Sequence, residues 1–146
     1  MSNDTVSATR DKVRRILTDK LGSVRLTNDD KFIVQHNSAV LFVSVEEGFN
    51  GGSVVNIGCP LITEVEITND LCRWVATQGQ HFRLGGCGII VNEGSSKGMV
   101  HFTYSLTGDD LDESELFNAV MAVIMCSDQL DNELRDRFGG SLFGPE

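Results

Sequence analysis

The residues of this sequence that are best suited to metal binding or nucleophilic chemistry are its cysteines and histidines. They are Cys59, Cys72, Cys87, Cys126, His36, His81 and His101. A structural zinc site draws on pairs such as CxxC or HxxxH, because two ligands must reach one ion from one turn or one helix face. No such pair occurs, so the sequence predicts no metal site. Each cysteine lies in an apolar segment, which predicts a reduced thiol used as a small core residue.

The segment RLGGCGIIVNEGSSKGMVHF, residues 83–102, invites comparison with a phosphate-binding loop because four glycines precede Lys97. A Walker loop places its lysine directly after the last glycine, whereas this lysine stands between a serine and a glycine. A dinucleotide-binding fingerprint also fails, because Gly86 and Gly88 lead into a β-branched run rather than a helix. We therefore predict a β-hairpin here, and no nucleotide or other cofactor.

The acidic run DDLDESE, residues 109–115, is another feature that could bind an ion. It lacks the glycine and the twelfth-position glutamate with which an EF-hand loop holds calcium. The chain also has no nucleophile elbow, so no catalytic residue is assigned. One enzymatic alternative stays open, a small enzyme whose site is assembled from dispersed residues. Candidates for that site are Asp29, Asp30, His81 and Glu93.

The formal net charge of −9 disfavours nucleic acid and anionic membranes as partners, because both require a positive field on the protein. Residues 1–25 carry six basic and three acidic residues, whereas residues 109–137 carry nine acidic and two basic ones. This polarity is typical either of a docking surface or of two solvated helix faces. No apolar run approaches the roughly 20 residues of a membrane span, and the first residues have no signal-peptide core. We therefore expect a cytoplasmic protein.

Apolar periodicity predicts three helices and five strands in one α+β domain, residues 1–146. Helices are expected at 4–21, 68–77 and 109–138, and strands at 31–36, 39–47, 53–67, 86–91 and 99–106. Thr68 is an N-cap candidate, and Asp112 followed by Glu115 is a start signal for the last helix. The order α-β-β-β-α-β-β-α, with short connections, predicts an antiparallel sheet packed against helices.

Alternation along the strands separates a core face of the sheet from an opposite face. The residues expected on the core face are Leu41, Val43, Val45, Cys87, Ile89, Val91, Val100, Phe102, Tyr104 and Leu106. In the middle helix, the expected buried side consists of Leu71, Cys72, Trp74 and Val75. Asn92, Gly94 and Gly98 are expected to be the turn residues of the hairpin.

The opposite face carries few large side chains. Gly86, Gly88, Ile90 and Met99 lie on it, and Phe42, Asn56 and Gly58 join it if the third strand runs in phase. Glycine inside a strand often marks the close approach of another backbone. This face is therefore a candidate partner-binding or dimer surface, with a bulge or a plain solvated face as the alternative. The predicted partner-binding residues are Phe42, Gly86, Gly88, Ile90 and Met99 on the sheet, and Arg10, Arg14 and Arg15 on the first helix.

Three segments carry a family resemblance: CPLITEVEIT, LTGDDLDESEL and SDQLDNELRDRFGG. Together with the order of the elements, they resemble the bacterial YbjN-like family, which shares the fold of type III secretion chaperones. The resemblance covers nearly the whole chain. It implies a small cytosolic protein, often dimeric, that acts as a peptide-binding chaperone-like domain or as a sensory transduction regulator. It supplies no catalytic residues.

The sequence therefore favours a non-enzymatic module that binds a protein or peptide, as a chaperone or a regulatory adaptor. We expect it to capture an extended segment of its partner along the sheet face and the first helix. The alternatives are the small enzyme described above and a signalling regulator without chaperone activity. A last helix that is apolar most of the way round, together with the bare sheet face, also predicts a homodimer.

Overall fold

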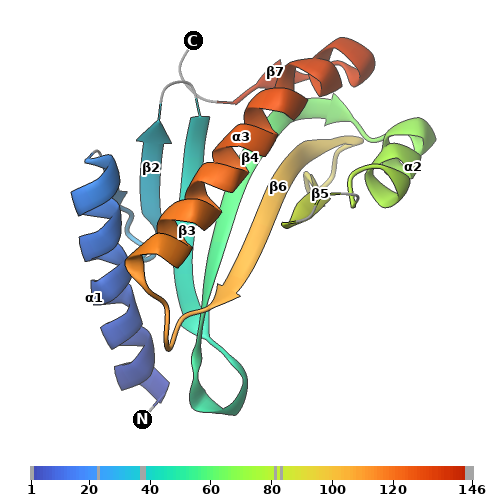
Figure 1. Cartoon of the computed structure of the whole chain (residues 1–146). Coiled ribbons are helices and arrows are strands. Elements are labelled where there is room, and N and C mark those ends of the chain that lie inside the picture. The colour runs from blue at the N-terminus through green and yellow to red at the C-terminus, as the bar shows by residue number, and fades with distance from the viewer. Residues whose placement is uncertain (1, 23, 37–38, 81, 83, 144–146) are drawn as a thin grey trace.

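The structure is a computed structural model that describes residues 2–22, 24–36, 39–80, 82 and 84–143. These residues form three α-helices and seven strands (Figure 1). In chain order the elements are α1 (Ser2–Leu21), β1 (Val24–Leu26), β2 (Phe32–His36), β3 (Ala39–Glu47), the short 3₁₀ helix η1 (Phe49–Gly51), β4 (Ser53–Glu66), α2 (Asn69–Thr77), β5 (Gly86–Val91), β6 (Lys97–Thr107), α3 (Glu113–Phe138) and β7 (Ser141–Leu142). The predicted α+β class and the predicted order of helices and strands are confirmed.

The strands form one antiparallel sheet in the order β1-β2-β3-β4-β6-β5. Strand β7 pairs with Ile62 and Thr63 of β4, past Gly58, the last β4 residue that pairs with β3. The two shortest strands, β1 and β7, are absent from the sequence prediction. A strand of two or three residues is too short for its hydrophobic pattern to be detected in the sequence. It forms here because a longer strand pairs with it.

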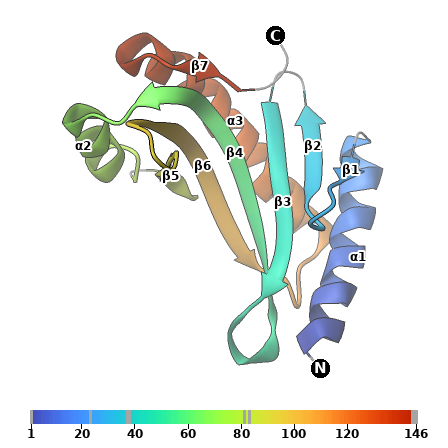
Figure 2. The same cartoon turned by 180° about the vertical axis from the view of Figure 1, so that it is seen from behind.

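Helices α1 and α3 cover one face of the sheet, which we call the core face (Figure 1). Seen from behind, the other side of β3, β4 and β6 has no helix across it (Figure 2). The core combines Val13, Ile16 and Leu17 of α1 with Leu116, Val120 and Val123 of α3 and with the sheet residues Leu41, Val43, Val55, Ile57 and Phe102. Burying each of these side chains contributes about 1.5–3 kcal/mol, so the burial pattern determines which face the helices cover.

The predicted helix termini are confirmed in detail. The side chain of Thr68 accepts a hydrogen bond from the backbone N–H of Leu71 and caps α2. At the start of α3, Asp112 accepts from the N–H of Glu115 at 2.8 Å, and Glu115 accepts in return from the N–H of Asp112. This capping box satisfies two backbone donors that would otherwise lack partners.

A buried polar contact fastens α1 to the start of β4 and to the β6–α3 connection. The hydroxyls of Thr9 and Ser53 lie 2.7 Å apart, and both residues are buried. Asp109 accepts from the N–H and from the hydroxyl of Ser53, each at 2.9 Å. The Lys12 ammonium donates to the backbone carbonyls of Asp109 and Leu111. Lys12 of α1 therefore helps to hold the β6–α3 connection in place.

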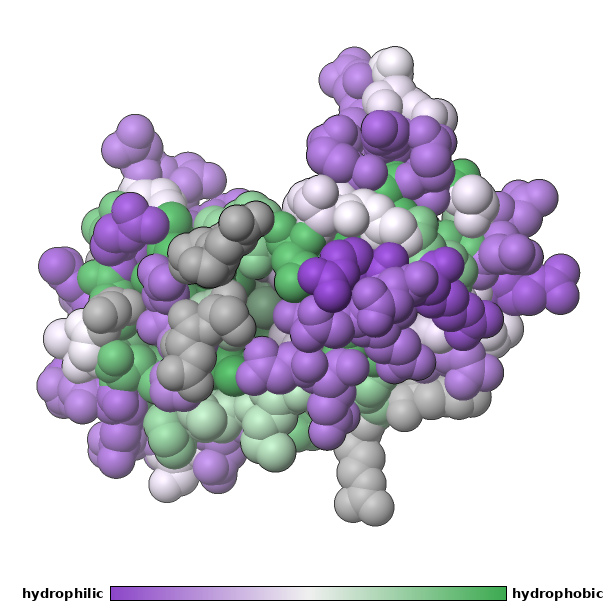
Figure 3. All heavy atoms as spheres, turned by 90° about the horizontal axis from the view of Figure 1, so that it is seen from above, coloured by the Kyte–Doolittle hydropathy of each residue, from purple (hydrophilic) through white to green (hydrophobic). Residues whose placement is uncertain are grey.

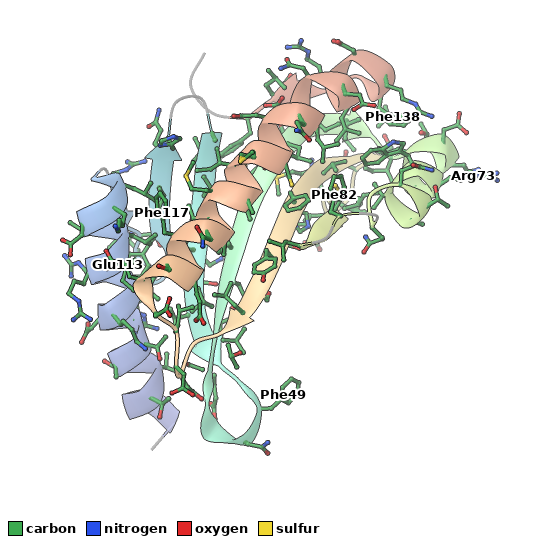
Figure 4. All side chains as sticks on the ribbon, in the orientation of Figure 1. Phe49, Arg73, Phe82, Glu113, Phe117 and Phe138 are labelled. Atoms are coloured by element: carbon green, nitrogen blue, oxygen red, sulfur yellow. The ribbon has the colours of Figure 1, made fainter. Side chains whose placement is uncertain are left out.

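Helix α3 also contacts α1. This contact explains part of the broad apolar surface of α3. The Lys20 ammonium lies 3.4 Å from the carboxylate of Glu113 and 5.8 Å from the ring centre of Phe117. Both α3 residues lie on the side next to α1 in Figure 4. Met125 remains 61% exposed on the outer side of the helix. Toward its C-terminus α3 presents a mostly hydrophilic surface, visible from above in Figure 3.

Three side-chain placements differ from the sequence prediction. Cys72 is exposed rather than buried, because the buried side of α2 consists of Leu71, Trp74 and Val75. Val91 is 58% exposed at the end of β5, which has a strand neighbour on one side only. Gly98 is a buried β6 residue rather than part of the turn. None of the helices in the described part of the chain combines the length and apolar sequence that a bilayer crossing requires.

Candidate partner-binding surface

The strand register places the predicted partner-binding residues of the sheet on one face. Phe42 pairs with Gly58, Gly58 with Thr103, and Thr103 with Gly86, so these four residues form one row across the sheet. Paired residues of antiparallel strands point to the same face. We call this surface the open face, because no helix crosses it in Figure 2.

The other predicted sheet residues also lie on the open face. Gly88 pairs with His101, and Ile90 pairs with Met99 near the β5 edge. Ile90 is 50% exposed. The prediction that third-strand residues share this face is therefore confirmed, because the two hairpins are in phase through β4.

A shallow hollow of about 360 Å³ lies at the centre of the open face. It is lined by Lys31, Phe42, Ser44, Asn56, Ile57, Gly58, Thr103 and Ser105. A Cβ atom built on Gly58 would have as its nearest neighbours the Phe42 carbonyl oxygen and the Thr103 methyl group, both at 4.0 Å. Gly58 therefore leaves space that a neighbouring side chain does not fill.

The floor of the hollow is polar and its side is aromatic. The Ser105 hydroxyl donates to the side-chain oxygen of Asn56 at 2.6 Å across β4 and β6. The ring of Phe42 packs against Phe143 with ring centres 6.0 Å apart. Phe143 follows β7. Sequence patterns do not place Phe143 on this surface, because its position depends on the pairing of β7 with β4. The hollow thus offers both hydrogen-bonding groups and an aromatic contact.

The glycines of β5 leave less open surface than predicted, although the predicted close approach of another backbone is found at Gly86. A Cβ on Gly88 would lie 3.1 Å from His101 Nε2, so the imidazole ring already covers this position. A Cβ on Gly86 would lie 3.1 Å from Gln80 Oε1 and 3.2 Å from the carbonyl oxygen of Gly79. The expectation that these two glycines leave the face bare is therefore wrong. They admit close packing, and Gly58 is the glycine that exposes the sheet.

The three arginines assigned to the surface lie elsewhere. Arg10, Arg14 and Arg15 belong to α1, which packs on the core face. Arg14 and Arg15 are exposed, on the far side of the sheet from Phe42. The predicted surface that joins the sheet residues to the first helix is thus divided between two sides of the molecule, because the apolar residues of α1 are buried against the core face.

The residues named for the alternative enzymatic site lie apart in the fold where the structure describes them. Asp29 and Asp30 lie between β1 and β2, and Glu93 lies between β5 and β6. These turns belong to opposite edges of the sheet. His81 lies outside the described residues. Within the described ranges, no group of three or more His, Cys, Asp or Glu side chains could hold a metal ion.

Burial holds three titratable side chains of the sheet, Cys59, Cys87 and His101, in their uncharged forms. Burial raises the pKa of the Cys87 thiol to about 12 and also raises the pKa of Cys59. Burial lowers the pKa of His101 below 6.5, so its ring is neutral at pH 7. A reactive thiol requires a lowered pKa and exposure. These three groups are therefore suited to packing rather than to nucleophilic chemistry.

One comparison with known proteins identifies a family. The model of a family described as "T3SS (YopN, CesT) and YbjN peptide-binding chaperone 1", where T3SS is the type III secretion system, matches residues 7–146. A search of curated protein sequences gave no significant match.

Solved structures with the same fold include YbjN from E. coli, with a TM-score of 0.73 and 9% identity over 93% of this chain and 96% of that chain. The ExsC–ExsE complex matches with a TM-score of 0.59 and 15% identity over 84% of this chain and 93% of that chain. The Yersinia pestis type III secretion chaperone SycH, in complex with a fragment of YscM2, matches with a TM-score of 0.54 and 9% identity over 84% and 98%. At these identities the structures show a shared fold.

Proposed function

Because the chain belongs to the family of type III secretion and YbjN peptide-binding chaperones, we propose that it binds an extended segment of a partner protein on its open face. The observation that carries this proposal is the hollow over Gly58, which is flanked by Phe42 and floored by polar groups. Two of the structures with this fold contain a protein partner, ExsE or YscM2. The proposed activity is non-covalent binding rather than catalysis.

The chemistry of the hollow suits a peptide. Side chains at alternate positions of an extended chain can reach one face of a sheet, whereas those between them point away. One apolar side chain can pack on the ring of Phe42, and a neighbouring backbone group can bond to Ser44 or Thr103 at the rim. Lys31 adds one positive charge at the side of the hollow.

An affinity measurement with a defined probe tests this function. A panel of immobilised 15-residue peptides of random sequence would select binders, and fluorescence anisotropy would then give the dissociation constant of each binder. Gly58→Val fills the hollow with a β-branched residue that suits a strand. We expect affinity to fall at least tenfold in this variant.

A control is Thr18→Val, which introduces the same β-branched residue at an exposed position of α1, away from the open face. We expect it to keep wild-type affinity. Equal affinity of Gly58→Val and the wild type for every selected peptide would overturn the open face as the binding site. The absence of any peptide binder in the panel would count against the function itself.

We further propose that the protein is a homodimer of the cytosol. The exposed Met125 on α3 and the exposed Ile90 on edge strand β5 support self-association. The four cysteines, which are all unpaired thiols, support a reducing compartment. Light scattering coupled to gel filtration tests the dimer, and a strict monomer at high concentration would contradict it.

A further inference from the structure

Within the part of the chain that the structure describes, the last residues of β6 have one edge without a strand partner, which we call the free edge. β6 runs from Lys97 to Thr107, but β5 pairs only with residues Gly98–Thr103 on that side. Among the described residues, none forms a backbone pair with 104–107 on that side. In Figure 1 the lower part of β6 continues toward the bottom of the sheet past the end of β5.

The hydrogen-bond pattern identifies the backbone groups at this edge. Backbone groups of a strand alternate between its two neighbours. The N–H of Gly108 donates to Ser53 at the start of β4, and the carbonyl of Lys97 accepts from the turn that ends β5. Even-numbered residues of β6 therefore face β4, and odd-numbered residues face the other side. Ser105 and Thr107 present their N–H and C=O groups at the free edge.

On the neighbouring edge strand β5 the outward backbone groups of Cys87 have partners, whereas those of Ile89 and Val91 have none among the described residues. The outward N–H of Cys87 donates to the carbonyl of Gly79 at 2.8 Å. The outward carbonyl of Cys87 accepts from the side chain of Gln80 at 2.7 Å. Proteins usually cover strand edges because unpaired groups promote association. Among the described residues, partners cover this edge at Cys87, and none pairs with the outward groups of Ser105 and Thr107.

A groove runs along the free edge on the core-face side. It has a volume of about 380 Å³ and lies between the end of β6 and the first turns of α3. We call it the edge groove, and its lining residues are Leu84, Tyr104, Leu106, Thr107, Leu111, Glu115, Asn118 and Ala119. Most of these side chains are apolar, and Leu84 is 42% exposed at the rim. A strand placed beside β6 would direct every second side chain into this groove.

The described side chains that line the edge groove include one negative charge and no positive charge, and the Lys12 ammonium bonds to the backbone carbonyl of Leu111 beside it. Glu115 is the one charged residue among the described residues that line it. Leu111, which also lines the groove, stands between Asp110 and Asp112. A second copy of the chain would bring the same carboxylates to the contact, and like charges at close range oppose binding. A basic segment would be attracted to the same site.

We infer that the free edge of β6 and the edge groove bind an extended partner segment that carries apolar residues at alternate positions and basic residues between or beside them. The segment adds a strand to the sheet next to residues 104–107. This inference rests on the proposed function and names the place and chemistry of the partner. One side of the added strand lies beside Ser105, at the margin of the hollow on the open face.

The test uses the full chain and a fluorescein-labelled heptapeptide that alternates valine and lysine. One control peptide carries glutamate in place of lysine, and another carries N-methyl groups on the amides of one edge. We expect saturable binding of the first peptide and at least tenfold weaker binding of both controls, because they reverse the charge or remove hydrogen-bond donors. Hydrogen exchange of the Ser105 and Thr107 amides should slow at least tenfold when the peptide is bound.

Two matched variants test whether peptide binding depends on the edge groove or on any exposed leucine. Leu84→Ser removes an exposed apolar side chain at the rim of the groove and should weaken binding several-fold. Leu26→Ser removes a similarly exposed leucine from β1, at the opposite edge of the sheet, and should leave binding unchanged. Equal losses in the two variants would contradict the assignment of the groove.

Other outcomes distinguish this inference from the proposed function. Binding that is lost in Gly58→Val while the amides of Ser105 and Thr107 exchange at unchanged rates overturns the inference and leaves the open face in place. The absence of saturable binding by the valine–lysine peptide also overturns it, and the peptide panel then decides the function separately. Protection of the two amides that rises with protein concentration without peptide indicates that a second copy occupies the edge, which also overturns the inference.

Discussion

Alanine substitutions at Gly58 and Gly86 of the open face should change the free energy of unfolding in opposite directions. At Gly58 an added Cβ makes only ordinary contacts, with nearest atoms at 4.0 Å. Alanine in a strand is about 0.5–1 kcal/mol more favourable than glycine, because glycine loses more conformational freedom on folding. We therefore expect Gly58→Ala to raise the free energy of unfolding by about 0.5 kcal/mol.

At Gly86 the same change should lower stability. The added Cβ would lie 3.2 Å from the carbonyl oxygen of Gly79, a backbone atom that cannot rotate away. Overpacking of this kind costs about 1–3 kcal/mol, which exceeds the gain from replacing glycine. We expect a net loss of about 1 kcal/mol. Gly88→Ala should fall between the two, because its close neighbour is the movable ring of His101.

Urea unfolding followed by the fluorescence of Trp74 measures these differences. Trp74 is the one tryptophan of the chain, and it is buried with its ring packed edge-on against Phe138. With a urea dependence of about 1–3 kcal/mol per molar, a change of 1 kcal/mol moves the midpoint by about 0.3–1 M. A loss at Gly58 as large as the loss at Gly86 would refute the assignment of Gly58 to an unfilled hollow.

Three further predictions follow from the local contacts. Asp112→Ala removes the capping box of α3 and should lower the free energy of unfolding by about 1 kcal/mol in thermal or urea unfolding; an unchanged midpoint would contradict the cap geometry. Burial lowers the pKa of His101, so the unfolded state takes up the proton first, and stability should fall as the pH drops below 6.5 through the folded-state pKa. A His101→Gln variant should lose this part of the pH dependence, and an identical pH profile for the two proteins would count against it. In the native protein a thiol-reactive dye should modify the exposed Cys72 first and Cys87 last, since burial raises the Cys87 pKa to about 12. Mass spectrometry of the labelled peptides gives the order of modification, and the reverse order would contradict this prediction.

The sequence predicted the long elements because each carries a local signal that survives without tertiary information. Val, Ile and Phe alternate along β3, and Asp112 with Glu115 marks the start of α3. The short strands β1 and β7 carry no such signal, because pairing with β2 and β4 creates them.

The candidate site was predicted in part. Alternation and the phase of the hairpins placed Phe42 and Gly86 on one face, as the register confirms. The sequence could not separate the two kinds of glycine, because the neighbours of a missing Cβ come from distant residues such as His101. It also could not determine which face of the sheet α1 covers, so it grouped the arginines of α1 with sheet residues that lie on the opposite face.

Peptide binding on the open face is tested most directly by mapping a bound peptide on the protein by NMR. A selected peptide from the panel would be titrated into isotope-labelled full-length chain, and amide shifts would be followed residue by residue. We expect shift changes concentrated at Phe42, Gly58 and Thr103 on the open face and continuing to Ser105 at the edge of β6. Changes confined to the outer surfaces of α1 or α3, with the open face unaltered, would contradict binding on the open face.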